Sequence, residues 1–97
     1  MDLNSLPKPG ADFKAKIGPS SFAYKLKSLV RYGKYNNLDN NLEAIIDTID
    51  DYEDYIQKGG LSRSLYFRAW SKIKRRSEDL TRDDEREIKK ILQYLRG

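Results

Sequence analysis

The sequence predicts an all-α fold, a compact bundle of three to four short helices with an irregular N-terminal arm. Apolar side chains recur every three or four residues through most of residues 20–97, which is the spacing of one helix face. No stretch alternates apolar and polar residues over the length of a strand. A chain of 97 residues has the size of one domain. We therefore expect a flexible arm at residues 1–19 and a single helical domain at residues 20–97.

The arm is defined by three prolines and two glycines within residues 1–19. Proline lacks a backbone donor and glycine adds conformational freedom, so regular structure is disfavoured here. Two large apolar residues, Phe13 and Ile17, lie among the lysines of the arm. Two interpretations stay open: a disordered tail, or an arm that becomes ordered when Phe13 and Ile17 dock into a protein partner.

The first helix is expected to begin at Ser20 or Ser21, because a serine hydroxyl can accept a free N–H of the first turn. Its apolar face consists of Phe22, Leu26, Leu29 and Val30. The helix should end between residues 33 and 37, where glycine and asparagine replace this pattern. A second face of the same helix carries cations, namely Lys27, Arg31 and Lys34.

The second helix has the clearest apolar periodicity, and we expect it to begin near Asn40 or Asn41. Its buried face is predicted to contain Leu42, Ile45, Ile46, Ile49, Tyr52 and Ile56. Gly59 and Gly60 should end it, since glycine tolerates the positive φ common after a helix C-terminus. Acidic residues near that end are unfavourable for the helix dipole, which indicates a positive element nearby.

The third and fourth helices are each preceded by a hydroxyl residue that can cap the first turn, Ser62 and Thr81. Thr81 and Asp84 have the spacing of a capping box, with Asp in place of the usual Glu or Gln. The predicted inner face of the third helix is Leu65, Tyr66, Ala69, Trp70 and Ile73. That of the fourth helix is Ile88, Ile91, Leu92 and Leu95.

The charges occur in blocks, although the formal net charge is only +4. Residues 37–57 contain seven acids and no base, whereas residues 58–77 contain seven bases and no acid. Tracts of one sign form surfaces for partners or for each other. The second helix is therefore expected to be acidic and the third basic.

The basic stripe of the third helix is the main candidate for contact with nucleic acid. Helical geometry places Arg68, Lys72 and Arg75 on the side opposite the apolar face. Cations in a row on a rigid helix can neutralise several phosphates at once. The predicted nucleic-acid-binding residues of this helix are Arg63, Arg68, Lys72, Lys74, Arg75 and Arg76. If the first helix lies alongside, the patch is extended by Lys27, Arg31 and Lys34.

Alternatives for this stripe are a solvated face, a face neutralised by the acidic second helix, or a surface for an acidic protein. Around Arg31, basic residues alternate with Tyr32 and Tyr35. These two rings could stack on unpaired nucleobases, or they could cover the rim of the protein core. The second and third helices with their glycine turn also fit a helix-turn-helix, whose recognition helix would present Arg63, Ser64 and Phe67. Because the acidic tract that contains its first helix would bring seven acids near phosphates, we favour backbone contact over sequence-specific readout.

The acidic face of the second helix is predicted to bind a protein partner or to complement this chain's own cations. Its residues are Asp47, Asp50, Asp51 and Asp54. Carboxylates at this spacing can hold Mg²⁺ or Ca²⁺, but the glycine-containing calcium loop is absent from the sequence. We therefore predict no metal and no other cofactor.

The composition argues against an enzyme. The chain has no Cys and no His, which excludes disulfides, the usual zinc sites and imidazole catalysis. No nucleotide-binding or metalloprotease motif occurs. We predict no catalysis, no small-molecule substrate and, without an apolar run long enough for a membrane or a secretory signal, a cytoplasmic location.

The function expected from the sequence is contact with the phosphate backbone of DNA or RNA by an accessory subunit of a larger complex, such as a polymerase or a nucleoprotein particle. Its partners would be nucleic acid and a larger protein. The alternative is a protein-interaction or regulatory module that uses the acidic helix and the arm and never touches nucleic acid. A chain with surfaces of both signs can join two components of opposite charge.

Overall fold

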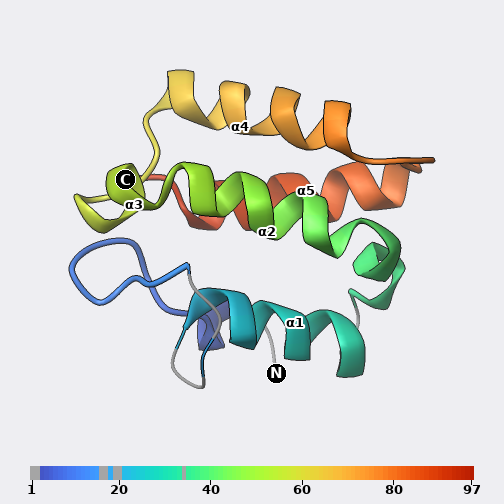
Figure 1. Cartoon of the computed structure of the whole chain (residues 1–97), viewed down its shortest axis with the longest axis horizontal. Helices are drawn as coiled ribbons and strands as arrows, with labels where there is room; N and C mark the ends of the chain where they lie inside the picture. The colour runs from blue at the N-terminus through green and yellow to red at the C-terminus, as the bar shows by residue number, and fades with distance from the viewer. Residues whose placement is uncertain (1–2, 16–17, 19–20, 34) are drawn as a thin grey trace.

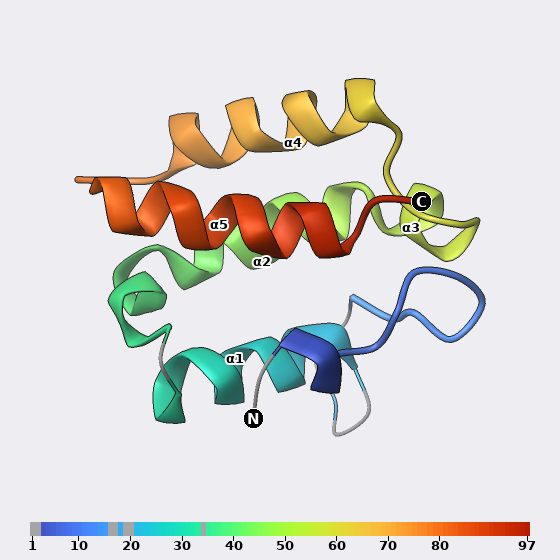
Figure 2. The same cartoon turned by 180° about the vertical axis from the view of Figure 1, so that it is seen from behind.

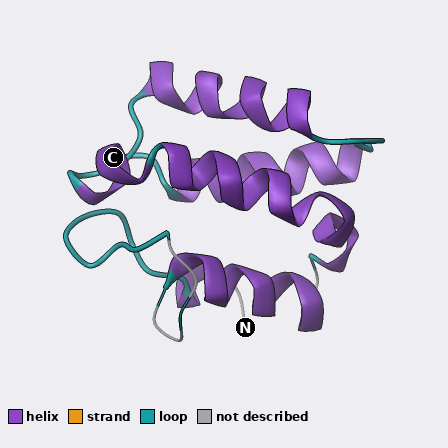
Figure 3. Ribbon diagram, in the orientation of Figure 1, coloured by secondary structure: helices purple, strands orange, loops and turns teal. Residues whose placement is uncertain are grey.

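The computed structural model is an all-α bundle, so the predicted fold class is confirmed (Figure 1, Figure 3). It describes residues 3–15, 18, 21–33 and 35–97. The predicted site residues Ile17 and Lys34 lie outside the described residues. The helices are η1 (Leu3–Ser5), α1 (Phe22–Tyr32), η2 (Asn36–Asn41), α2 (Leu42–Asp51), α3 (Glu53–Gln57), α4 (Arg63–Arg76) and α5 (Arg82–Tyr94).

The helices are arranged in tiers. In Figure 1 and in the reverse view of Figure 2, α4 runs along one side of α2 and α5, and α1 runs along the opposite side. Helices α2 and α4 are antiparallel, because Arg76 at the end of α4 contacts Thr48 of α2 while Lys72, one turn earlier, lies over the ring of Tyr52. α1 and α4 are therefore separated by the middle tier.

The apolar stripes predicted for the helices meet in one core. Among its fully buried members are Leu26, Leu29, Ile45, Ile73, Ile88 and Ile91. Leu65 and Tyr66 are only partly buried and pack against the core from α4. The periodicity of the sequence thus identifies the inner face of each long helix.

Three helix starts are capped as the sequence predicts. The Oγ atoms of Ser21 and Ser62 accept hydrogen bonds from the N–H groups of Tyr24 (3.1 Å) and Leu65 (3.2 Å). At α5, Thr81 Oγ1 accepts from the Asp84 N–H, and Asp84 Oδ2 accepts from the Thr81 N–H, both at 3.1 Å. This is the predicted capping box.

The second predicted helix begins where expected, with Asn41 at the N-cap position of α2, but it is not continuous. The 3-10 helix η2 precedes α2, and the chain is interrupted at Tyr52 before α3. The side chain of Asn41 forms no capping hydrogen bond with α2, because it binds the α4–α5 connection instead. Its Nδ2 donates to the Glu78 carbonyl (3.0 Å), and its Oδ1 accepts from the Glu78 N–H (2.9 Å).

The turn between α3 and α4 contains the predicted glycines. Gly59 and Gly60 have φ values of +140° and +118°, which L side chains rarely adopt. A Cβ on Gly60 would also collide with the backbone of Gly97. This close approach lets Leu61 form a parallel bridge with Arg96, which fixes the end of the chain beside the turn.

The described part of the N-terminal arm packs against the helices. Phe13 is fully buried, with its ring centroid 5.1 Å from that of Phe22. The Gly10 N–H donates to the Ile56 carbonyl at 2.9 Å, and Leu6 is buried nearby in the same core. The expectation that Phe13 docks into a partner is therefore corrected: this chain's own core takes the ring, because burial of so much apolar area is favourable.

Tyr94→Phe should lower the free energy of unfolding by about 1 kcal/mol near neutral pH, because the Tyr94 hydroxyl donates to the Leu6 carbonyl at 2.5 Å. Burial raises the pKa of Tyr94 above its ordinary value of 10.0. The folded state thus holds the hydroxyl proton more tightly than the unfolded state does. The contribution of Tyr94 to the free energy of unfolding is therefore full below pH 10 and is lost as the pH rises through the folded-state pKa. Urea denaturation of both proteins should show a difference that shrinks above pH 10; a difference independent of pH would contradict this.

Candidate nucleic-acid interface

Helix α4 presents a basic surface because its two sides differ in composition. Ala69, Trp70 and Ile73 anchor its inner side in the core. Between Arg63 and Arg76 the helix has six basic residues and no acidic one, and its exposed cations are Arg63, Arg68, Lys74, Arg75 and Arg76. Their position on a packed helix means that little backbone order has to be gained when an anion binds.

Two cations in the last turn of α4, Lys74 and Arg76, are engaged within the molecule. Arg76 Nη2 lies 2.9 Å from Asp51 Oδ2, and its Nη1 donates to Thr48 Oγ1 at 3.1 Å. The Lys74 ammonium lies 5.7 Å from the ring centroid of Trp70, and that of Lys89 lies 5.3 Å from the same ring. Arg76 thus joins α4 to α2, and its contribution to an external site is reduced.

Three other cations of α4, Arg68, Lys72 and Arg75, line a groove. Arg68 and Arg75 form no ion pair with any residue that the structure describes. The Lys72 ammonium lies 4.9 Å from the ring centroid of Tyr52. The groove has a volume of about 390 Å³ and is lined by Tyr52, Phe67, Arg68, Ser71, Lys72 and Arg75. Three predicted cations are therefore brought together with two aromatic rings.

The acidic face of α2 neutralises the basic stripe only at one end. Among the described residues, Asp51 is the member of the predicted acidic set that pairs with an α4 cation. A second groove, of about 620 Å³, follows this boundary and is lined by Glu43, Ala44, Asp47, Asp50, Asp51 and Arg76. Asp54 is exposed farther along, in α3. In the described parts of the chain, no group of three or more acidic side chains is arranged to hold a metal ion.

The cations of the first helix do not join this surface. α1 lies on the far side of α2 and α5 from α4, so the single patch expected from both stripes is not formed (Figure 1). Lys27 pairs instead with Glu43 of α2 at 3.7 Å, and Arg31 is exposed on the α1 side. Of the two aromatics in this region, Tyr32 is 82% exposed and Tyr35 is buried. Tyr35 therefore belongs to the core.

The helix-turn-helix arrangement is not found. In that motif the two helices cross steeply, whereas α2 and α4 lie side by side and antiparallel (Figure 1). Arg63, which would read bases from the start of a recognition helix, lies 6.0 Å from the ring centroid of Phe67. For a nucleic-acid ligand, the geometry thus favours contact along the side of α4 over insertion of the N-terminus of α4 into a groove of the duplex.

Tyr52 and Phe67 line the groove but are not among the predicted nucleic-acid-binding residues; Phe67 appears only in the helix-turn-helix alternative. Tyr52 was assigned to the buried face of a helix, and it is buried, but its ring also forms part of the groove. Phe67 is 52% exposed on the outer side of α4. The sequence did contain a signal for Phe67, since this aromatic lies outside the apolar stripe and beside the cations.

Neither a membrane-spanning helix in the described part of the chain nor a related protein helps to assign this surface. Within the described residues, every helix is too short or too polar to cross a bilayer. Comparison of the chain with protein-family models, with curated proteins and with solved structures found no match.

Proposed function

We propose that the protein binds nucleic acid without catalysing a reaction, and that α4 contacts the phosphate backbone. The observation that carries this proposal is the convergence of Arg68, Lys72 and Arg75 on one groove, while Arg68 and Arg75 form no ion pair within the described residues. Such cations can displace the counterions that surround a chain of phosphates. Arginine adds two parallel N–H donors that match phosphate oxygens.

The acidic surface supports an accessory role in a larger DNA- or RNA-handling complex. Asp47 and Asp50 are exposed in the groove beside Arg76, on a side of the molecule that would repel phosphates. A basic protein subunit is complementary to this surface. The chain would then hold nucleic acid with α4 and a protein with α2.

The second candidate function is a protein-interaction module that does not contact nucleic acid. The acidic groove of about 620 Å³ favours it, because a basic peptide could bind there without using α4. Phe13 no longer supports this alternative, since its side chain is buried in the core. The two functions differ in whether the cations of α4 are needed.

The double variant Arg68→Ala/Arg75→Ala should bind DNA and RNA about tenfold more weakly than the original chain near 50 mM salt. It should also flatten the plot of log K against log salt by about 1 to 2 units, because two phosphate contacts are lost. Fluorescence anisotropy of a labelled oligonucleotide across a salt series measures both quantities. Circular dichroism should be unchanged, since both side chains are exposed.

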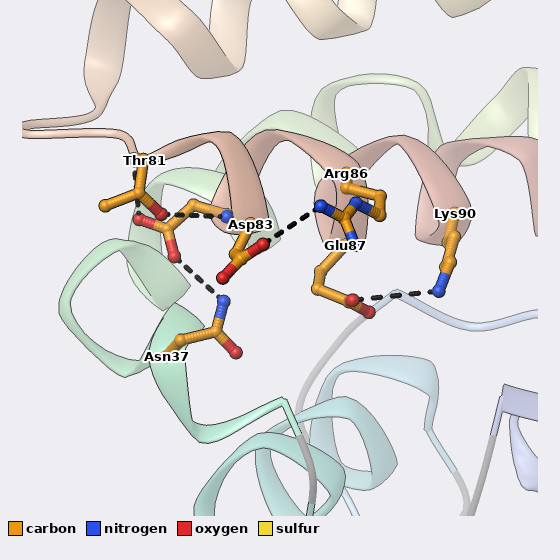
Figure 4. Close-up of polar contacts among 7 residues, drawn as sticks. Asn37, Thr81, Asp83, Arg86, Glu87 and Lys90 are labelled. Atoms are coloured by element: carbon orange, nitrogen blue, oxygen red, sulfur yellow. Dashed lines mark hydrogen bonds and ion pairs between the residues drawn. The ribbon is translucent and has the colours of Figure 1, made fainter.

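The matched control is Arg86→Ala/Lys90→Ala, which removes the same charge from α5. These residues pair with Asp83 (3.0 Å) and Glu87 (3.7 Å), and Lys90 points away from α4 (Figure 4). The affinity of the control should stay within about twofold of that of the original chain. Its salt slope should stay within about 0.5 unit of the original slope. Equal losses in both variants would mean that only net charge matters. No binding by the original chain near 50 mM salt would exclude the proposal in favour of the protein-interaction module.

A further inference from the structure

We infer that the groove on α4 takes an unpaired base, so that the preferred ligand is single-stranded nucleic acid. This inference rests on the proposed function and names its class of ligand. It is carried by the aromatic residues of the groove, which phosphate contact alone does not require. Base stacking on aromatic rings, next to a groove of cations, is how proteins hold single strands without reading their sequence.

Phe67 is the first of these aromatic residues. It is 52% exposed, although most large apolar side chains of this chain are buried. Its ring is held edge-on by Tyr66, with centroids 5.2 Å apart and planes at 88°. The ring is therefore exposed and restrained at the same time, which reduces the entropy cost of stacking a base on it.

The aromatic surface continues from α4 toward α3. Tyr52 lines the same groove as Phe67 but is only 6% exposed, and its ring centroid is 6.2 Å from that of Tyr55. Tyr55 is 52% exposed. The half-exposed ring of Phe67 therefore lies beside the cations Arg68 and Lys72, so a strand whose phosphates contact α4 can direct a base onto it.

The surroundings of the groove disfavour a duplex. In paired DNA or RNA the faces of the bases are covered by their neighbours, so Phe67 would gain no stacking partner. A duplex is also wider than a strand, and the exposed carboxylates of Asp47 and Asp50, which line the groove beside Arg76, would repel a second phosphate backbone there. A single strand can follow α4 without that repulsion.

The test compares an oligothymidylate of about twelve nucleotides with a duplex of the same length, using the full chain and fluorescence anisotropy near 50 mM salt. The single strand should bind at least tenfold more tightly than the duplex. Phe67→Leu should weaken binding of the single strand about tenfold, with duplex binding and the salt slope unchanged. Phe67→Trp keeps an aromatic ring and should retain the affinity of the original chain for the single strand.

The possible failures are distinguishable. If strand and duplex bind equally, and Phe67→Leu binds as well as Phe67→Trp, the preference for unpaired bases is wrong while the proposed contact with phosphates stands. If neither oligonucleotide binds, the proposed function itself fails. Circular dichroism of both Phe67 variants confirms that a loss of binding is not a loss of folding; at a half-exposed position the helical signal should be retained.

Discussion

Phe13→Ala should lower the free energy of unfolding by about 3–5 kcal/mol. The ring is 0% exposed and contacts Phe22, so its removal leaves a cavity as well as losing apolar burial. A loss of this size is a large part of the 5–15 kcal/mol that stabilises a typical domain. Urea denaturation followed by circular dichroism measures it.

Lys14→Ala is the control for this prediction, because Lys14 is the next residue and its side chain is exposed. It should change the free energy of unfolding by no more than about 0.5 kcal/mol. If Phe13→Ala were equally harmless, residues 3–15 would contribute little to the core in solution. The interpretation of the N-terminal segment as a detachable arm would then be restored.

Asp84→Ala should lower the free energy of unfolding by about 2–3 kcal/mol, the second largest effect that we expect. The carboxylate is buried, with Oδ2 accepting from the Thr81 N–H and Oδ1 accepting from Asn37 Nδ2 at 2.8 Å. One side chain therefore caps α5 and ties it to η2; its partners Thr81 and Asn37 are labelled in Figure 4. Alanine would remove both contacts and leave their donors to find other acceptors.

Asp83→Ala provides the comparison within the same helical turn. Asp83 is exposed, and its ion pair with Arg86 at 3.0 Å is a surface pair between residues of one helix. Such a pair contributes only about 0.3–0.5 kcal/mol. Thermal or urea denaturation should therefore rank Asp84→Ala far below Asp83→Ala in stability. Similar values would show that the contact with Asn37 adds nothing beyond ordinary helix electrostatics.

The features that the sequence predicted well are local. Ser21, Ser62 and Thr81 cap their helices because a cap depends on atoms three residues away along the chain. The apolar stripes were equally clear, since helical periodicity is a property of neighbouring residues. The all-α fold follows from these two signals.

The features that were missed depend on contacts between distant segments. Asn41 looked like a cap, but it binds the backbone of Glu78, which is 37 positions away. Phe13 was expected to be exposed, because the composition of the arm does not show that the folded helices supply its packing partners. At the candidate site, the pairing of Arg76 with Asp51 depends on the register of α2 against α4. Only that register shows which cations of the basic stripe are left unpaired and can contact an external anion.

The hydrogen bond between Tyr94 and Leu6 has a consequence for how the protein forms. Its two residues are 88 positions apart, so the opening segment must wait for the final helix before it reaches its native position. Helices themselves grow within microseconds, but closing so long a loop is slow. During synthesis on the ribosome, the nascent chain would hold Leu6 and Phe13 without their full native surroundings until α5 has emerged. Completion of the fold thus requires that α5 has already been synthesised.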